Sequence, residues 1–505
     1  MSKADRIRRA HAEEIARLQQ KKQSKKTPGW VYGLIIGVVG AIAAVVIVVL
    51  ALQLTGTTLR NTISVVGSSD DDRVEIDNAV MCYFFMNNYS NYVNQYGSYL
   101  SYLGLDTSDS LKEQEYYGAE DTTWYDYFAG LAKTQVEELI ITAMAAKDAG
   151  YEAEDEINSR IEKSMENIKG YADKNGYSLQ KYISLCYGTG VKESDLRNAL
   201  KLHYTAQTFY EHLYEGYKYT DAEIDAYFEK NAKDFMYFDT LSYTFTATYD
   251  KDATTTEKNK ALADIKAEAE KLLATKDEAA FKAWVEQYLK AQEKKDTEIA
   301  TALDGLANKD SKYNKDNAAA VWVYEDGRQL NDTTLIVDEK AYTCTVYMVT
   351  KLPARYEYNT VDARHILFTK DTWGSNEKAK AKAEEVFAAF QKDPTAENFA
   401  KLVKEYSEDT GSVENGGLYE NITKDYMVEE FDAWIFDAAR KNGDCEIVKT
   451  DYGYHIMFFE GVSDPAWKIS VETAMKNEAY TAAYDEFKKD IKVTVDDKKL
   501  GKLPF

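Results

Sequence analysis

Two histidines and one carboxylate are the residues in the second half of this 505-residue chain whose types and spacing could do chemistry. His365 and His455 each lie in a short alternating stretch typical of a strand, and Asp409 follows a helical stretch. Met427 and Phe431 are four residues apart and could share an apolar helix face. Such groups could act on a polar bond beside an apolar surface. Buried histidines can equally hold strands together by hydrogen bonds, and a Met–Phe pair can be plain helix core.

These residues belong to a series of separated motifs. The series comprises Ala363-Arg364-His365-Ile366-Leu367, Tyr406-Ser407-Glu408-Asp409, Asn415-Gly416-Gly417, Met427 with Phe431, and Thr450-Asp451-Tyr452-Gly453-Tyr454-His455-Ile456. In order and spacing it resembles the parvulin family of peptidyl-prolyl isomerases over residues 358–462. The layout of the whole chain more loosely resembles the PrsA/SurA-type foldases.

The resemblance implies a cleft that holds a proline ring and needs no metal or cofactor. It implies catalytic roles for four residues: His365, Asp409, Thr450 and His455. It implies substrate binding by four others: Met427, Phe431, Tyr419 and Tyr452. Rotation about an X–Pro bond faces a barrier of about 18–20 kcal/mol, because twisting breaks amide resonance. An apolar pocket with polar groups that fit the twisted amide better than the planar one would lower this barrier without a nucleophile.

The sequence departs from the family pattern in two places. Leu418-Tyr419-Glu420 follows the paired glycines, where the family commonly has Asp-Leu-Gly, so Tyr419 replaces a pocket leucine. The segment 370–374 lacks the Arg/Lys cluster of phosphate-directed parvulins. We therefore do not expect a preference for phosphoserine-proline.

A membrane anchor is predicted near the N-terminus. Residues 29–54 contain an uncharged apolar run from Trp30 to Leu52, long enough to span the hydrocarbon layer. The basic tail 1–28 before it predicts a cytoplasmic N-terminus and an extracytoplasmic main body at the cell membrane. A cleaved signal peptide is the alternative, although Ala51-Leu52-Gln53-Leu54 matches a cleavage site poorly.

Charge and cysteine content narrow the choice of partners. The net charge is -23, and the only strongly basic segment is residues 1–28, so the rest of the chain is more acidic still. An acidic body argues against nucleic acid as a partner. The four cysteines are widely spaced without a CxxC pair, which indicates neither a zinc site nor a disulfide framework.

The pattern predicts an α+β multidomain chain. After the anchor we expect a spacer (55–72), an all-α chaperone-like domain (73–235) and a C-terminal helix and tail (463–505). The helical domain is dense in tyrosine, which could form either a surface that grips varied chains or a helix core. We expect the C-terminal helix to return to the helical region.

Between these parts the order of elements occurs twice, which predicts two parvulin-like (FKBP-like βα₃β₂) domains. The isomerase domain is expected at residues 358–462, and the first copy, residues 236–352, is expected to be degenerate because it lacks the Gly-Gly motif. When the strands of the two copies are aligned, Tyr243 corresponds to His365 and Thr345 corresponds to His455. We expect the first copy to bind or space and not to isomerise.

The expected function is a membrane-anchored foldase that isomerises X–Pro bonds in unfolded or partly folded exported polypeptides. The alternative is a non-catalytic holdase chaperone that uses the parvulin domains as a scaffold. A structural protein of the envelope is a third possibility.

Overall fold

The computed structural model describes residues 51–505, which divide into two compact units. One unit contains the residues up to Tyr217 together with Ala479–Phe505, and the other contains Lys218–Glu478. In the described residues, no helix is long and apolar enough to cross a membrane. The predicted tail, and the anchor apart from its last four residues, lie outside this part of the chain.

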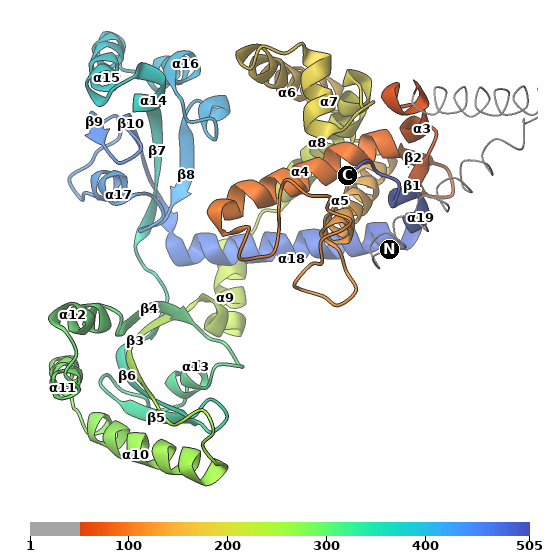
Figure 1. Cartoon of the computed structure of the whole chain (residues 1–505). Coiled ribbons are helices and arrows are strands. Elements are labelled where there is room, and N and C mark those ends of the chain that lie inside the picture. The colour runs from red at the N-terminus through yellow and green to blue at the C-terminus, as the bar shows by residue number, and fades with distance from the viewer. Residues whose placement is uncertain (1–50) are drawn as a thin grey trace, which may run out of the picture. The chain divides into compact units, whose positions relative to one another are not determined.

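The first unit is mainly helical (Figure 1). Its helices are α3 (Thr57–Arg60), α4 (Asn78–Tyr96), α5 (Trp124–Asp148), α6 (Glu154–Lys174), α7 (Leu179–Tyr187) and α8 (Glu193–Gly216), with a short 3-10 helix η1 (Gly97–Tyr99). Side-chain caps define where the long helices begin: Asp77 accepts from two backbone N–H groups of α4, and Thr123 forms a capping box with Asp126 at α5.

This unit also contains a small antiparallel sheet, although the sequence predicted an all-α domain here. Its strands are β1 (Ile63–Ser68), β2 (Arg73–Asp77) and β11 (Lys492–Val495), in the order β11-β1-β2. Residues 55–72, expected to be a spacer, therefore supply the central strand, and Val65 on it is fully buried. Residues 73–235, expected to be all helix, begin with a strand.

The ten tyrosines between residues 83 and 127 divide between the core and the surface of the helical unit. Most of them pack in its core: Tyr83, Tyr89, Tyr92, Tyr96, Tyr116, Tyr125 and Tyr127. Three others are largely exposed, namely Tyr99, Tyr102 and Tyr117. Tyr99 and Tyr102 lie in the long irregular connection between α4 and α5, together with Tyr117. A tyrosine-rich core therefore carries a few exposed rings at its surface.

The C-terminal segment completes the helical unit, as predicted. From residue 479 to the end of α18 (Ala466–Asp490), and on through β11 and α19 (Asp497–Leu500), the chain belongs to this unit. The Tyr125 hydroxyl donates to the Leu500 carbonyl at 2.8 Å, and Phe505 stacks on Phe85 with ring centroids 4.8 Å apart. The core of the unit thus joins residues from both ends of the chain.

A chain ending at Asp490 should lose much of the stability of the helical unit. It would lack three buried apolar side chains, Ile491, Leu500 and Leu503, together with the edge strand β11. Because burying one such side chain contributes about 1.5–3 kcal/mol, we expect a loss of at least about 3 kcal/mol. Hydrogen exchange of α5 amides would measure it. As a control, a chain ending at Leu503 loses only Pro504 and Phe505 and should be affected far less. Equal protection in all three chains would contradict this account.

The second unit contains two α+β domains with the same topology (Figure 1). The first has strands β3 (Tyr237–Thr246), β4 (Ala307–Lys312), β5 (Thr333–Asp338) and β6 (Thr343–Ala354), in the order β4-β3-β6-β5. Its helices are α10 (Thr255–Leu273), α11 (Glu278–Ala291), α12 (Asp296–Asp304) and α13 (Ala318–Val323), and α9 (Asp221–Phe235) precedes it.

The second domain repeats this arrangement. Its strands are β7 (Asn359–Phe368), β8 (Leu418–Ile422), β9 (Cys445–Lys449) and β10 (Tyr454–Pro465), in the order β8-β7-β10-β9. Its helices are α14 (Lys370–Trp373), α15 (Asn376–Phe390), α16 (Ala396–Tyr406) and α17 (Glu429–Ile435), with a 3-10 turn η2 (Val413–Asn415). Both domains contain one more strand, β4 or β8, than the βα₃β₂ order expected from the sequence.

The strand registers correct the alignment of the two domains by one residue. His365 pairs with Met457 and His455 with Leu367, so the two histidines are diagonal neighbours on one face of the sheet. In the first domain, Ser242 pairs with Tyr347 and Thr244 pairs with Thr345. Ser242 and Thr345 are therefore the diagonal neighbours that correspond to His365 and His455. Tyr243 lies instead on the opposite face, packed against the core beneath α10 and α11. Since side chains alternate along a strand, a shift of one residue reverses the face.

Candidate active site

The two predicted histidines form the centre of one continuous hydrogen-bonded chain. His365 on β7 and His455 on β10 meet with their Nδ1 atoms 3.0 Å apart, and their rings are nearly parallel. His365 Nε2 lies 2.7 Å from Asp409 Oδ2 at one end. His455 Nε2 lies 2.8 Å from Thr450 Oγ1 at the other end. All four residues that the resemblance marked as catalytic are therefore in contact in series.

The direction of this chain follows from its end at Asp409. Hydrogen bonds from His365, Ser412 and Tyr419 hold the pKa of the Asp409 carboxyl well below its usual range, so it is ionised and only accepts. His365 Nε2 therefore carries a proton. With neutral imidazoles, His455 Nδ1–H donates to His365 Nδ1 and the Thr450 hydroxyl donates to His455 Nε2. Thr450 Oγ1 itself accepts from the backbone N–H of Tyr452 at 3.1 Å.

Burial keeps His455 neutral. Desolvation, and secondly the neighbouring His365, lower its pKa to about 3. Both histidines are about 5 % exposed. The buried histidine pair thus links the Thr450 hydroxyl to the Asp409 carboxylate by hydrogen bonds. The two imidazoles are not independent bases that face solvent.

Asp409 is held by Ser412, Gly411 and Tyr419, of which the sequence had indicated only Tyr419, as a substrate-binding residue. The buried hydroxyl of Ser412 donates to Asp409 Oδ2, and the backbone N–H of Gly411 donates to Oδ1 at 3.2 Å. The phenol of Tyr419 also donates to Oδ2, at 3.0 Å. A serine three residues after the aspartate, in a turn, is a weak sequence signal, because side chains of this type bond to nearby turns in many proteins.

The paired glycines allow the loop carrying Asp409 to close on the histidine strand. Gly416 and Gly417 have φ of 71° and 78°, in the left-handed region that favours glycine. The backbone N–H of His365 donates to the Gly417 carbonyl at 3.0 Å. A Cβ on Gly417 would lie 2.5 Å from the His365 carbonyl oxygen. The Gly-Gly motif is therefore needed for this close approach.

An aromatic ring from α17 forms the apolar side of the site. Phe431 meets both histidine rings edge-on, with centroids 5.5 Å from His365 and 5.9 Å from His455. It belongs to a core cluster that also contains Met457, with Met427 and Tyr419 packed at its margin. Met427 and Tyr419 are partly buried, whereas Tyr452 is exposed. Of the four residues expected to bind substrate, two thus contact the hydrogen-bonded chain through their rings, Phe431 and Tyr419.

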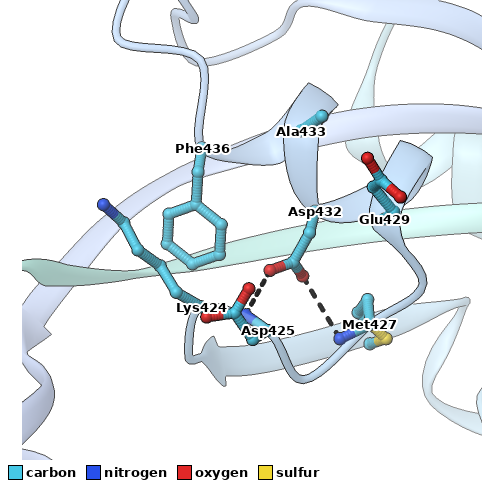
Figure 2. A pocket seen from close by; sticks show the side chains of 7 residues that line it. All are labelled: Lys424, Asp425, Met427, Glu429, Asp432, Ala433 and Phe436. Atoms are coloured by element: carbon cyan, nitrogen blue, oxygen red, sulfur yellow. Dashed lines mark hydrogen bonds between the residues drawn. The ribbon is translucent and has the colours of Figure 1, made fainter. Parts of the chain in front are cut away.

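A hollow of about 600 Å³ lies beside α17 and is lined by Met427, Asp432 and Phe436, among others (Figure 2). Figure 2 shows the Asp432 carboxylate accepting from the backbone N–H groups of Asp425 and Met427. Asp432 thereby holds the turn that presents Met427, a role with no local sequence signal. The histidines and Asp409 do not line this hollow.

The domain built in this way is a PPIC-type peptidyl-prolyl isomerase domain. Residues 347–461 match the family model described as "PPIC-type PPIASE domain". The match confirms the class that the motif series predicted for this part of the chain.

Similar proteins are foldases of the PrsA type. The chain is 34% identical over 144 residues to the foldase protein PrsA of Caldanaerobacter subterraneus subsp. tengcongensis, covering 27% of this chain and 42% of that protein. It is 33% identical over 159 residues to PrsA of Staphylococcus epidermidis, covering 28% and 48%. The aligned part is thus less than half the length of these relatives.

Solved structures give a weaker comparison. The crystal structure of PrsA from Bacillus subtilis shares 19% identity and a TM-score of 0.18, covering 62% of this chain and 90% of that one.

Proposed function

We propose that the chain is a membrane-anchored, extracytoplasmic foldase whose PPIC-type domain catalyses rotation about X–Pro bonds in unfolded or partly folded exported polypeptides. The observation that carries this proposal is the hydrogen-bonded series from Asp409 to Thr450, bordered by the edge-on ring of Phe431. The PrsA relatives, named as foldases, support the wider role.

The residues present suit a reaction in which no covalent bond is broken. Phe431 and Met427 would hold the proline ring in an apolar, poorly hydrated place. Asp409 would act through its fixed negative charge, oriented by His365 and Ser412, and not as a general base. Because the planar and twisted amides differ in charge distribution, a preorganised field favours one over the other without reorganising during the reaction.

The first α+β domain is proposed to be inactive. Ser242, Thr345 and Asn308 occupy the register positions of His365, His455 and Tyr419, since Thr240 pairs with Asn308 as Ala363 pairs with Tyr419. The Asn308 amide donates to Ser242 Oγ at 2.9 Å. These short side chains supply neither a fixed charge nor an aromatic wall, so we assign the domain a binding or spacing role.

A holdase function is the alternative, and the exposed rings of Tyr99, Tyr102 and Tyr117 favour it, because tyrosine couples a large apolar face to a polar tip. Refolding of a denatured protein limited by X–Pro isomerisation separates the two functions. We expect catalytic amounts of the full chain, in detergent micelles, to accelerate the slow phase. Suppression of aggregation at stoichiometric amounts, with the slow phase unchanged, would support the holdase and overturn the isomerase proposal.

A further inference from the structure

One oxygen of the Asp409 carboxylate receives more hydrogen bonds than it can hold equally well. Oδ2 accepts from His365 Nε2 at 2.7 Å, from the Ser412 hydroxyl and from the Tyr419 phenol at 3.0 Å. Oδ1 accepts only the Gly411 backbone N–H among the bonds of the described residues. A carboxylate oxygen offers about two lone-pair directions. One of the three donors on Oδ2 can therefore break its hydrogen bond, and the two that remain still satisfy the negative charge.

Tyr419 is the donor best placed to leave. Its bond is longer than that of His365, and it is partly exposed, whereas His365 and Ser412 are buried. It lies on the edge strand β8, and its ring rests against His365 with centroids 5.5 Å apart. The hydroxyl therefore belongs to a partly exposed side chain that contacts both Asp409 and His365.

The phenol remains a donor throughout the working pH range. Desolvation, followed by the hydrogen bond to the Asp409 anion, raises the pKa of Tyr419 to about 12. The resembled family commonly has a leucine, which has no hydroxyl, at the position of Tyr419.

Twisting an X–Pro amide creates an acceptor that the planar bond lacks. In the planar amide the nitrogen lone pair is delocalised into the carbonyl, and this resonance is lost on rotation. The prolyl nitrogen of the twisted amide can then accept a hydrogen bond. A donor aimed at that nitrogen binds the transition state and not the ground state, which is the condition for accelerating the reaction.

We propose that Tyr419 is a catalytic residue of this domain: on substrate binding its hydroxyl exchanges Asp409 for the prolyl nitrogen of the twisting X–Pro bond. The inference rests on the proposed isomerase function. Asp409 keeps His365 and Ser412 as donors during the exchange, so its charge stays fixed and satisfied. Before substrate binds, the hydrogen bond to Asp409 keeps the Tyr419 hydroxyl close to the position where it acts.

The test compares Tyr419→Phe with Ser412→Ala in the full chain, using a protease-free assay of peptide isomerisation. Each variant removes one donor from Asp409 Oδ2, but only Tyr419 would also touch the substrate. We expect Tyr419→Phe to lower kcat about tenfold, the worth of one hydrogen bond of about 1.4 kcal/mol, with KM unchanged. Ser412→Ala should lower kcat less, and the double variant should show both losses.

Three results would overturn the inference while leaving the isomerase proposal intact. They are an unchanged kcat in Tyr419→Phe, a loss confined to KM, and equal, non-additive losses in the two single variants, which would mean that Tyr419 acts only through Asp409. Tyr419→Leu should behave like Tyr419→Phe, because both lack the hydroxyl. An inactive parent chain on several X–Pro peptides would instead count against the isomerase function, and with it this inference.

Discussion

Replacing Asp409 by alanine should lower kcat/KM for X–Pro isomerisation by about a hundredfold, the usual effect of removing one preorganised electrostatic group. The variant loses the only charge fixed at the end of the histidine chain. It also leaves three donors, on His365, Ser412 and Tyr419, without their shared acceptor. His365 would remain packed between its neighbours, but the direction of its hydrogen bond with His455 would no longer be fixed by an ionised acceptor.

Two further variants sharpen this prediction. Asp409→Cys should keep part of the activity, because a thiol ionised beside His365 would restore part of the negative charge. Asp371→Ala removes an exposed carboxylate of the same domain and should leave the activity unchanged. Full activity in Asp409→Ala, measured on a folded chain, would contradict an electrostatic role for this residue.

The isomerase domain should lose stability as the pH falls from about 6.5 to about 3. Burial lowers the pKa of His455 to about 3, below its ordinary value of 6.5. In this window the unfolded chain binds a proton that the folded chain excludes, so stability is fully present above pH 6.5 and decreases as the pH falls. A shift of this size corresponds to at most about 5 kcal/mol, since each pKa unit is worth 1.36 kcal/mol.

Asp409 adds a second loss at lower pH. Its pKa is depressed in the folded chain, so its contribution is present above the ordinary aspartate value of 3.8 and disappears below it. The two groups therefore act in largely separate windows. The groups that face His455 are His365, Thr450 and Phe431, and the imidazole of His365 contacts it directly.

Hydrogen exchange of β7 and β10 amides, corrected for its intrinsic pH dependence, measures this effect in the full chain. We expect protection to decrease between pH 6.5 and 4, and His455→Gln to flatten this decrease while costing stability at neutral pH. Protection that is independent of pH in the parent chain would show that His455 is not held neutral by burial.

The sequence predicted the long helices well because their signals are local. The stretches 255–275 and 278–292 have the charged, periodic pattern of helices, and they form α10 and α11 with ends within two residues, each beginning at a side-chain cap. Their apolar positions recur with the helical period, and the caps mark the first turn. The class of the second α+β domain was predicted by its motif series for the same reason, since each motif is short and contiguous.

Pairings between distant residues were not predictable in the same way. Strand β1 pairs with β11, which follows it by more than four hundred residues, and neither strand is longer than six. Strand β4 reads Ala307-Asn308-Lys309-Asp310-Ser311-Lys312 and has no alternating apolar pattern. Short polar edge strands are specified by the strand beside them and not by their own residues.

The site shows the same limit at the level of single residues. The sequence predicted that His365, Asp409, Thr450 and His455 act together, and the structure brings them into contact. It predicted Tyr419 as part of the pocket, but its bond to Asp409 depends on the register that pairs Ala363 with Tyr419. The misplaced Tyr243 had the same origin, because only the observed pairing decides which face a strand residue occupies.

Isomerisation of an X–Pro peptide by the full chain, beside its Met427→Ala/Phe431→Ala variant, tests the central claim most directly. Phe431→Leu serves as a control that keeps most of the buried volume of a residue only 3 % exposed. We expect the parent to accelerate exchange, the double variant to fall to the uncatalysed rate with β7 and β10 still protected, and Phe431→Leu to retain part of the activity. A parent chain that leaves exchange at the uncatalysed rate on several X–Pro peptides would contradict the account, and the domain would then be a scaffold for a holdase.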